Sequence, residues 1–173
     1  NIGADSSWVA DGLDYVSGSH LGVLIPYDPI LQITSQITLI VGLRTASLSN
    51  AWAKGISQGH DDSYTLQANH NGLDSPSMRI WIGGVSYSAC GSTNIADGKQ
   101  HVIIGTYDGS NVKILVDGIQ EASISASGAI DAVTYNVGIG IDPLHMSTDY
   151  YTGQIQLAYI YNRSLSNGRS SFG

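Results

Sequence analysis

The side chains best suited to chemistry in this 173-residue chain are imidazoles and carboxylates on predicted loops. His60-Asp61-Asp62 forms the densest group, and His70 and His145 lie on two other predicted loops. These residues could converge on a zinc ion, but no histidine pair has the helical i, i+4 spacing and the single cysteine, Cys90, has no cysteine partner. We therefore favour solvated loop side chains over a zinc site, and we interpret His101, within a predicted strand, as structural.

Four loop aspartates offer oxygen ligands for a hard cation: Asp61, Asp62, Asp142 and Asp149. Ca²⁺ prefers several carboxylate and carbonyl oxygens, and loops supply both. The spacing of these aspartates matches no EF-hand loop. We expect no obligatory cofactor, and we expect Ca²⁺ at these four residues if an ion is bound.

Aromatic side chains on the same loops favour sugar binding. Trp52, Tyr150 and Tyr151 could cover the C–H faces of a sugar while neighbouring polar groups bond its hydroxyls. The predicted ligand-binding set is Trp52, His60, Asp61, Asp62, Asn69, Asn71, Tyr150 and Tyr151. The alternative for Trp52 is a place in the core. Adjacent tyrosines at the start of a strand point to opposite faces, so one of Tyr150 and Tyr151 would be buried.

The carboxylates do not form a glycosidase pattern. Glycoside hydrolysis needs two carboxyl groups flanking the scissile bond, and related sandwich enzymes carry them as alternating residues on one strand. Here Glu121 is the only glutamate, and no predicted strand has alternating acidic residues. A G-x-S-x-G nucleophile elbow is also missing from the sequence. We therefore predict that the chain is not an enzyme; a glycoside hydrolase is the weak alternative.

The elements that must position these loops are short strands. Asp108-Gly109 and Asp117-Gly118 punctuate the alternating runs 101–107 and 111–116, which predicts a three-strand meander in the middle of an antiparallel sheet. Gly83-Gly84 predicts a second hairpin. Further strands are predicted at 36–44, 51–56, 64–68, 134–141 and 153–162. In the last of these, Ile155, Leu157, Tyr159 and Tyr161 alternate on one face and Ile160 breaks the pattern.

Composition agrees with an all-β fold. Gly is abundant at 21 residues and only 12% of the chain is charged. About eleven short strands with turn signals between them are typical of a β-sandwich. We predict one domain over 1–173. The net charge of −7 and the scattered Lys and Arg disfavour nucleic acid and anionic membranes as partners. The first residue is Asn, so we expect a processed chain or a piece of a larger one.

Three stretches carry a resemblance to a known family. Asp11-Gly12-Leu13-Asp14-Tyr15-Val16 resembles an opening "DG-x-D-Y-V" strand. The run from Asp97-Gly98-Lys99-Gln100-His101-Val102 to Leu115-Val116-Asp117-Gly118 is similar to "DGKWHHVAGTYDG…LYVDG", and 153–166 is similar to "GxIDEVRIYNRALS". Together they resemble the laminin-G-like, concanavalin A-like jelly-roll domains. The usual acidic pair of the last motif is replaced by Gln156 and Leu157, which weakens a calcium site of the kind some relatives hold there.

The resemblance implies a jelly-roll β-sandwich and a recognition domain. We expect a non-catalytic module that binds a glycan or another surface ligand through loops at one end of the sandwich. The alternative is a structural or adhesion module of a larger assembly, such as a virion decoration or fibre, or a cell-surface protein. Either function implies an extracellular, cell-surface or virion-surface location without membrane insertion.

Overall fold

The computed structural model describes residues 6–9, 12–15 and 22–165. Apart from one 3-10 turn, η1 (Pro29–Leu31), its regular elements are all strands. In chain order they are β1 Ser6–Val9, β2 Gly12–Tyr15, β3 Val23–Ile25, β4 Ile37–Arg44, β5 Lys54–Gln58, β6 Tyr64–Gln67, β7 Ser77–Ile82, β8 Val85–Cys90, β9 Gln100–Tyr107, β10 Asn111–Val116, β11 Ile119–Ser125, β12 Val137–Ile139 and β13 Gly153–Tyr161.

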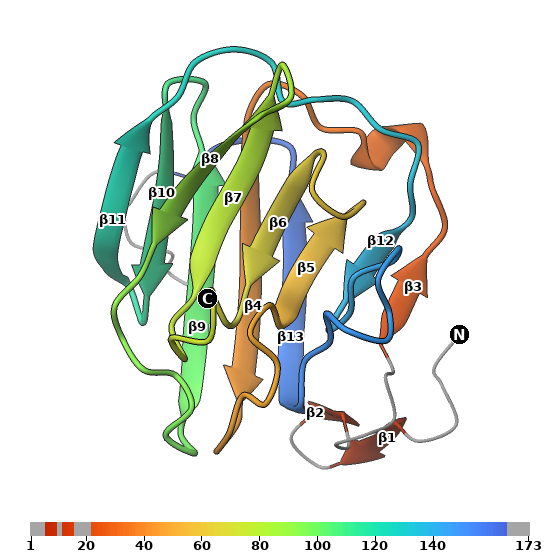
Figure 1. Cartoon of the computed structure of the whole chain (residues 1–173), viewed down its shortest axis with the longest axis vertical. Helices are drawn as coiled ribbons and strands as arrows, with labels where there is room; N and C mark the ends of the chain where they lie inside the picture. Colours follow the sequence, from red (N-terminus) through yellow and green to blue (C-terminus); the bar gives the residue numbers. More distant parts are fainter. Residues whose placement is uncertain (1–5, 10–11, 16–21, 166–173) are drawn as a thin grey trace, which may run out of the picture.

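The strands form two facing antiparallel sheets (Figure 1). The seven-stranded sheet has the order β1-β2-β13-β4-β9-β10-β11, and the six-stranded sheet has the order β3-β12-β5-β6-β7-β8. Neighbours within each sheet are often far apart in the sequence, as β13 and β4 are. This is the jelly-roll sandwich that the sequence predicts.

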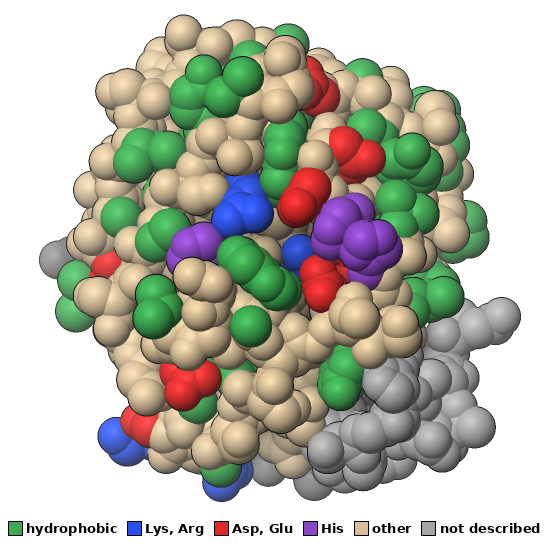
Figure 2. Space-filling view, in the orientation of Figure 1, with side chains coloured by type: hydrophobic (Ala, Val, Ile, Leu, Met, Phe, Trp, Pro, Cys, Tyr) green, Lys and Arg blue, Asp and Glu red, His purple; other side chains and the backbone are tan. Residues whose placement is uncertain are grey.

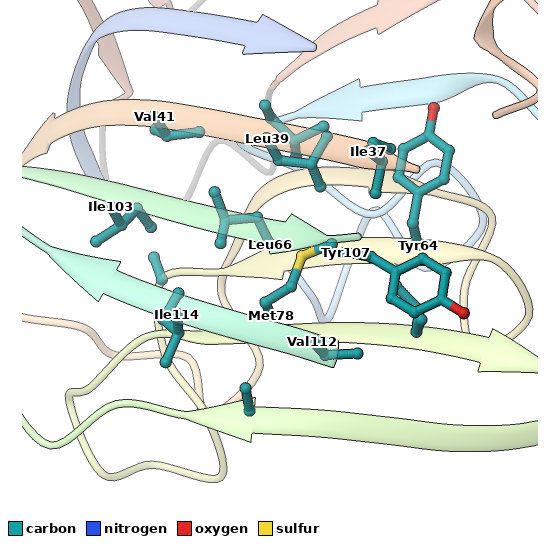
Figure 3. Close-up of a cluster of buried hydrophobic side chains, with 14 of the residues drawn as sticks. Ile37, Leu39, Val41, Tyr64, Leu66, Met78, Ile103, Tyr107, Val112 and Ile114 are labelled. Atoms are coloured by element: carbon teal, nitrogen blue, oxygen red, sulfur yellow. The ribbon is translucent and has the colours of Figure 1, made fainter. Parts of the chain in front are cut away.

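The core lies between the sheets (Figure 3). β4 is buried on both faces over all but its last residue, which confirms the interpretation of its continuous apolar run. Leu39 and Val41 from β4 pack with Leu66 and Met78 from the opposite sheet, and all four are fully buried. Alternating side chains of the two inner faces thus fill one shared layer.

The predicted meander is confirmed as β9, β10 and β11. Gly109 and Gly118 have φ angles of 91° and 83°, the left-handed values that favour glycine in tight turns. The meander forms one end of the seven-stranded sheet, with β11 at its edge, so the prediction of a central position is wrong. The middle strand of this sheet is β4, which pairs with β13 on one side and with β9 on the other.

His101 links the turn between β10 and β11 to the turn that precedes β9. Its Nδ1 lies 2.8 Å from the Asp117 carboxylate and its Nε2 lies 3.1 Å from Asp97. Burial acts to lower the pKa of His101, but the hydrogen bonds and charges of the two carboxylates outweigh it and raise that pKa. Asp117 also accepts the Val102 N–H at 2.8 Å. This residue is therefore a structural histidine, as its place in a strand predicts.

Two strand boundaries differ from the prediction. β5 begins at Lys54 rather than Ala51, because the Asn50 side chain accepts the Trp52 N–H at 2.8 Å and holds residues 50–53 in a turn. β12 covers only Val137–Ile139 of the predicted 134–141 strand.

The predicted face of β13 is wrong beyond Ile155. A β-bulge between Ile155 and Leu157 shifts the register against β4. Ile155 faces the core, but after the bulge Ala158 and Ile160 face it, while Tyr159 is 45% exposed. Ile160 breaks the sequence alternation because the strand itself contains an extra residue.

Candidate functional site

A pocket of about 310 Å³ lies on the outer face of the six-stranded sheet. Figure 2 shows blue, red and purple side chains gathered around an apolar one at the centre of this face. The lining residues are Trp52, Lys54, His60, Asp61, Arg79, His145 and Asp149. Two larger hollows around Arg44 and Gly98 are more open, and no aromatic side chain of the described residues lines either.

The floor of the pocket is polar and buried. A register shift between Lys54 and Ile56 places Ile56 in the core and leaves Lys54 opposite Gln67 on the outer face. Lys54 is only 1% exposed and Gln67 is fully buried, so the surrounding loops cover this part of the outer face. Arg79 lies on the same outer face, opposite Thr65 of β6.

A buried charge network joins the floor to two loops. The Lys54 Nζ lies 3.6 Å from the carboxylates of both Asp142 and Asp149. Asp142 is fully buried, and its Oδ1 accepts the backbone N–H groups of Leu144 and His145 at 2.9 and 3.0 Å. Buried charges persist when they are paired and hydrogen-bonded, and Asp142 meets both conditions.

Asp142 also positions His60. The His60 Nδ1 lies 2.8 Å from the Asp142 Oδ2, so a neutral His60 ring carries its proton on Nδ1 and leaves Nε2 unprotonated. The rings of His60 and His145 are 3.6 Å apart between centroids and tilted by 38°. Asp61 lies 3.6 Å from the His60 Nε2. One wall of the pocket is therefore a pair of imidazoles flanked by carboxylates.

The opposite wall combines a guanidinium with aromatic rings. The Arg79 guanidinium carbon lies 5.4 Å from the Trp52 ring centroid and 5.6 Å from that of Trp81, at cation–π distance from both. The Arg79 Nε donates to Ser88 Oγ at 2.7 Å, which fixes the guanidinium plane. The rings of Trp52 and His70 are nearly perpendicular, with 5.4 Å between their centroids. Trp52 is thus held in place but remains half-buried at the surface, outside the core cluster.

The structure brings some of the predicted site residues together. Trp52, His60, Asp61 and Asp149 line the pocket, and Asp142 lies beneath it. Loops far apart in the sequence converge here because β12 pairs with β5, which places the 142–149 loop beside the 59–62 loop.

The remaining predicted residues lie elsewhere. Asn69 is buried and structural, since it donates to Asn50 O at 2.9 Å and accepts the Asp74 N–H at 3.0 Å. Asn71 occupies an exposed turn with a φ of 55°. Tyr151 is 1% exposed in the core, and Tyr150 forms a β-bridge with Ile141. Asp62 is half-buried outside the pocket lining, and desolvation raises its pKa.

Sequence reasoning missed Lys54 and Arg79 as site residues. Each is a lone cation within a predicted strand, and Arg79 alternates with Trp81. A long charged side chain in an otherwise uncharged strand signals the outer face of the sheet. Lys54 also bears on the predicted Ca²⁺ ligands, because its ammonium already balances Asp142 and Asp149.

Comparison with known proteins places the fold in a family. The model of the concanavalin A-like lectin/glucanases superfamily matches residues 17–169, and the chain belongs to that superfamily. A search of curated proteins found no match. Among the described residues, no helix is long and apolar enough to cross a membrane.

Several solved structures share the fold at low sequence identity. The CBM40 domain of the Ruminococcus gnavus IT-sialidase, bound to α2,3-sialyllactose, is 17% identical with a TM-score of 0.65, covering 84% of this chain and 92% of that one. Domain 4 of AbnA, a GH43 extracellular arabinanase from Geobacillus stearothermophilus, in complex with arabinotriose, is 15% identical with a TM-score of 0.71, covering 96% and 78%. Domains LG4-5 of the mouse laminin alpha1 chain are 15% identical with a TM-score of 0.72, covering 98% and 46%.

Proposed function

We propose that this domain is an extracellular, non-catalytic module that binds a glycan in the pocket beside Trp52. The observation that carries the proposal is a half-buried tryptophan fixed at the surface next to converging polar groups. Sugars are recognised in this way, with an aromatic face against their C–H groups and a few placed hydrogen-bonding groups for their hydroxyls.

The size and chemistry of the pocket suit a short saccharide. About 310 Å³ lies at the lower end of the range for small-molecule sites. Asp61 and Asp149 provide acceptors, Arg79 provides donors, and the two histidines provide either. The similarity to domains solved with sialyllactose and with arabinotriose supports a glycan as the ligand class.

The carboxylates of the network favour binding over hydrolysis. A glycosidase needs an acid and a second carboxylate that both face the substrate. Asp142 is fully buried, and its oxygens are occupied by His60 and by two backbone N–H groups. Asp149 is largely buried and shares the Lys54 ammonium with Asp142. Asp142 therefore serves to hold the loops, and the ammonium of Lys54 keeps Asp149 paired as a carboxylate.

A glycan array followed by titration calorimetry tests the proposal. The wild-type domain should bind a defined set of glycans, and Trp52→Ala should weaken the strongest by about tenfold or more, a loss of about 1.4 kcal/mol. Tyr159→Ala is the matched control, because Tyr159 is an exposed aromatic residue on the seven-stranded sheet. Thermal melts of both variants show whether the fold is kept. A silent wild-type domain on broad arrays would contradict the proposal and favour the structural or adhesion module.

A further inference from the structure

Three metal-ligating side chains meet at the edge of the pocket. One atom each of His60, His145 and Asp149 lies within 4.8 Å of the others. His60 belongs to the loop after β5, and His145 and Asp149 belong to the loop between β12 and β13. All three residues also line the pocket, but sugar binding alone does not require two stacked imidazoles beside a carboxylate.

A single buried carboxylate positions both histidines. The Asp142 Oδ2 bonds the His60 Nδ1 at 2.8 Å, while its Oδ1 accepts the His145 backbone N–H at 3.0 Å. Metal-ligating histidines almost always donate their second N–H to such a partner, which fixes the tautomer and makes the other nitrogen a better ligand. The bond to Asp142 leaves Nε2 as the His60 nitrogen that can bind an ion. Because Nδ1 is the nitrogen that lies 3.8 Å from Asp149, the His60 and Asp149 side chains must shift for Nε2 and Asp149 to share an ion.

The ligand set selects the kind of ion. Two imidazoles and one carboxylate suit zinc and its transition-metal neighbours, whereas Ca²⁺ takes six to eight oxygens. The Lys54 Nζ, 3.6 Å from Asp149, opposes any cation, so an ion held by charge alone is disfavoured. Strong bonds to nitrogen overcome that repulsion in a way that calcium–oxygen contacts do not.

The loops need only a small movement to close on an ion. Ligand atoms of a tetrahedral zinc site are about 3.3 Å apart, so separations of up to 4.8 Å must shrink. His145 is exposed and comes from a loop, so it moves with little loss of packing. Three protein ligands leave the fourth position open toward the pocket, as in zinc sites that bind a further molecule.

We propose that His60, His145 and Asp149 bind one divalent transition-metal ion of the zinc class, with Asp142 as the positioning residue behind His60. The three ligands also line the glycan pocket, but binding of the ion does not depend on a glycan. The test uses the metal ion alone. A chain that binds no metal would therefore not contradict glycan binding, and a chain that binds no glycan would not contradict the metal site.

The test is calorimetric titration of the whole chain, free of any polyhistidine tag and stripped with EDTA, with ZnCl₂ and separately with CaCl₂. We expect one Zn²⁺ per chain, and binding at least about tenfold weaker in His145→Ala and in Asp149→Asn. His70→Gln is the control. Because His70 lies outside the cluster, this variant should bind Zn²⁺ as tightly as the wild-type chain does.

Cobalt provides a second readout. Co²⁺ in the wild-type chain should give the visible absorption of a four-coordinate site, and His145→Ala should lose it. No saturable Zn²⁺ uptake by the wild type, equal uptake by His145→Ala, or tight binding of Ca²⁺ but not Zn²⁺ would each overturn the proposal.

Discussion

Replacing Lys54 by Met tests the buried charge network beneath the pocket. Met has nearly the length of Lys and fills its space, so the variant removes the charge with little change in packing. The two carboxylates within 3.6 Å, Asp142 and Asp149, then lose their shared cation while remaining largely buried. Removing one partner of a buried ion pair costs about 3–5 kcal/mol.

The structure places the effect at the lower end of that range. Asp142 keeps its bonds from His60, Leu144 and His145, so we expect a loss of about 3 kcal/mol. For a chain of this length, that corresponds to a fall in Tm of about 6–12 °C. Urea and thermal unfolding followed by circular dichroism measure both quantities.

The matched control is Lys99→Met. The Lys99 Nζ is closer to its partner, 2.9 Å from Asp97, but its side chain is 78% exposed. We expect no measurable change, because solvent screens exposed ion pairs. The double variant Lys54→Met/Asp149→Asn should lose less free energy of unfolding than the sum of the losses in the two single variants. A Lys54→Met variant as stable as the wild type, or one that loses no more stability than Lys99→Met, would refute the reasoning.

Two further predictions concern the meander. Gly109→Val and Gly118→Val should each lower Tm, since a β-branched residue at φ angles of 91° and 83° costs about 1–3 kcal/mol, and unchanged melts would contradict the turn assignment. His101 has a raised pKa when folded, so its contribution is complete below the unfolded value of about 6.5 and is lost as the pH rises through the folded pKa. Tm measured from pH 6 to pH 9 should therefore fall more for the wild type than for His101→Gln, and equal slopes would show that the Asp97 and Asp117 contacts do not stabilise the protonated ring.

Local signals predict most of the fold. Asp-Gly and Gly-Gly pairs between alternating runs give both hairpins, and continuous apolar character gives the doubly buried β4. These features depend on residues close together in the sequence. The bulge in β13 also has a local signal in the sequence, because Ile160 breaks the alternation. The position of the bulge, however, follows only from the register of β13 against β4.

The site is less predictable because it depends on pairing between distant strands. Loop histidines and aspartates are visible in the sequence, but only the pairing of β12 with β5 brings Asp142 to His60. Lys54 reaches the site because a bulge turns it to the outer face, and Arg79 reaches it because β7 neighbours β6. No local pattern encodes which loops cover the outer face of a sheet.

The proposed function requires that the glycan occupies the pocket beside Trp52. The most direct measurement is an ¹⁵N NMR titration of the wild-type chain with the strongest glycan from the array. We expect saturable shifts of the Trp52 indole N–H, of the Arg79 Nε–H and of the 142–149 backbone, with little change around Arg44 and Gly98. Shifts centred on the Arg44 hollow, with the Trp52 indole unmoved at saturation, would contradict the proposed function.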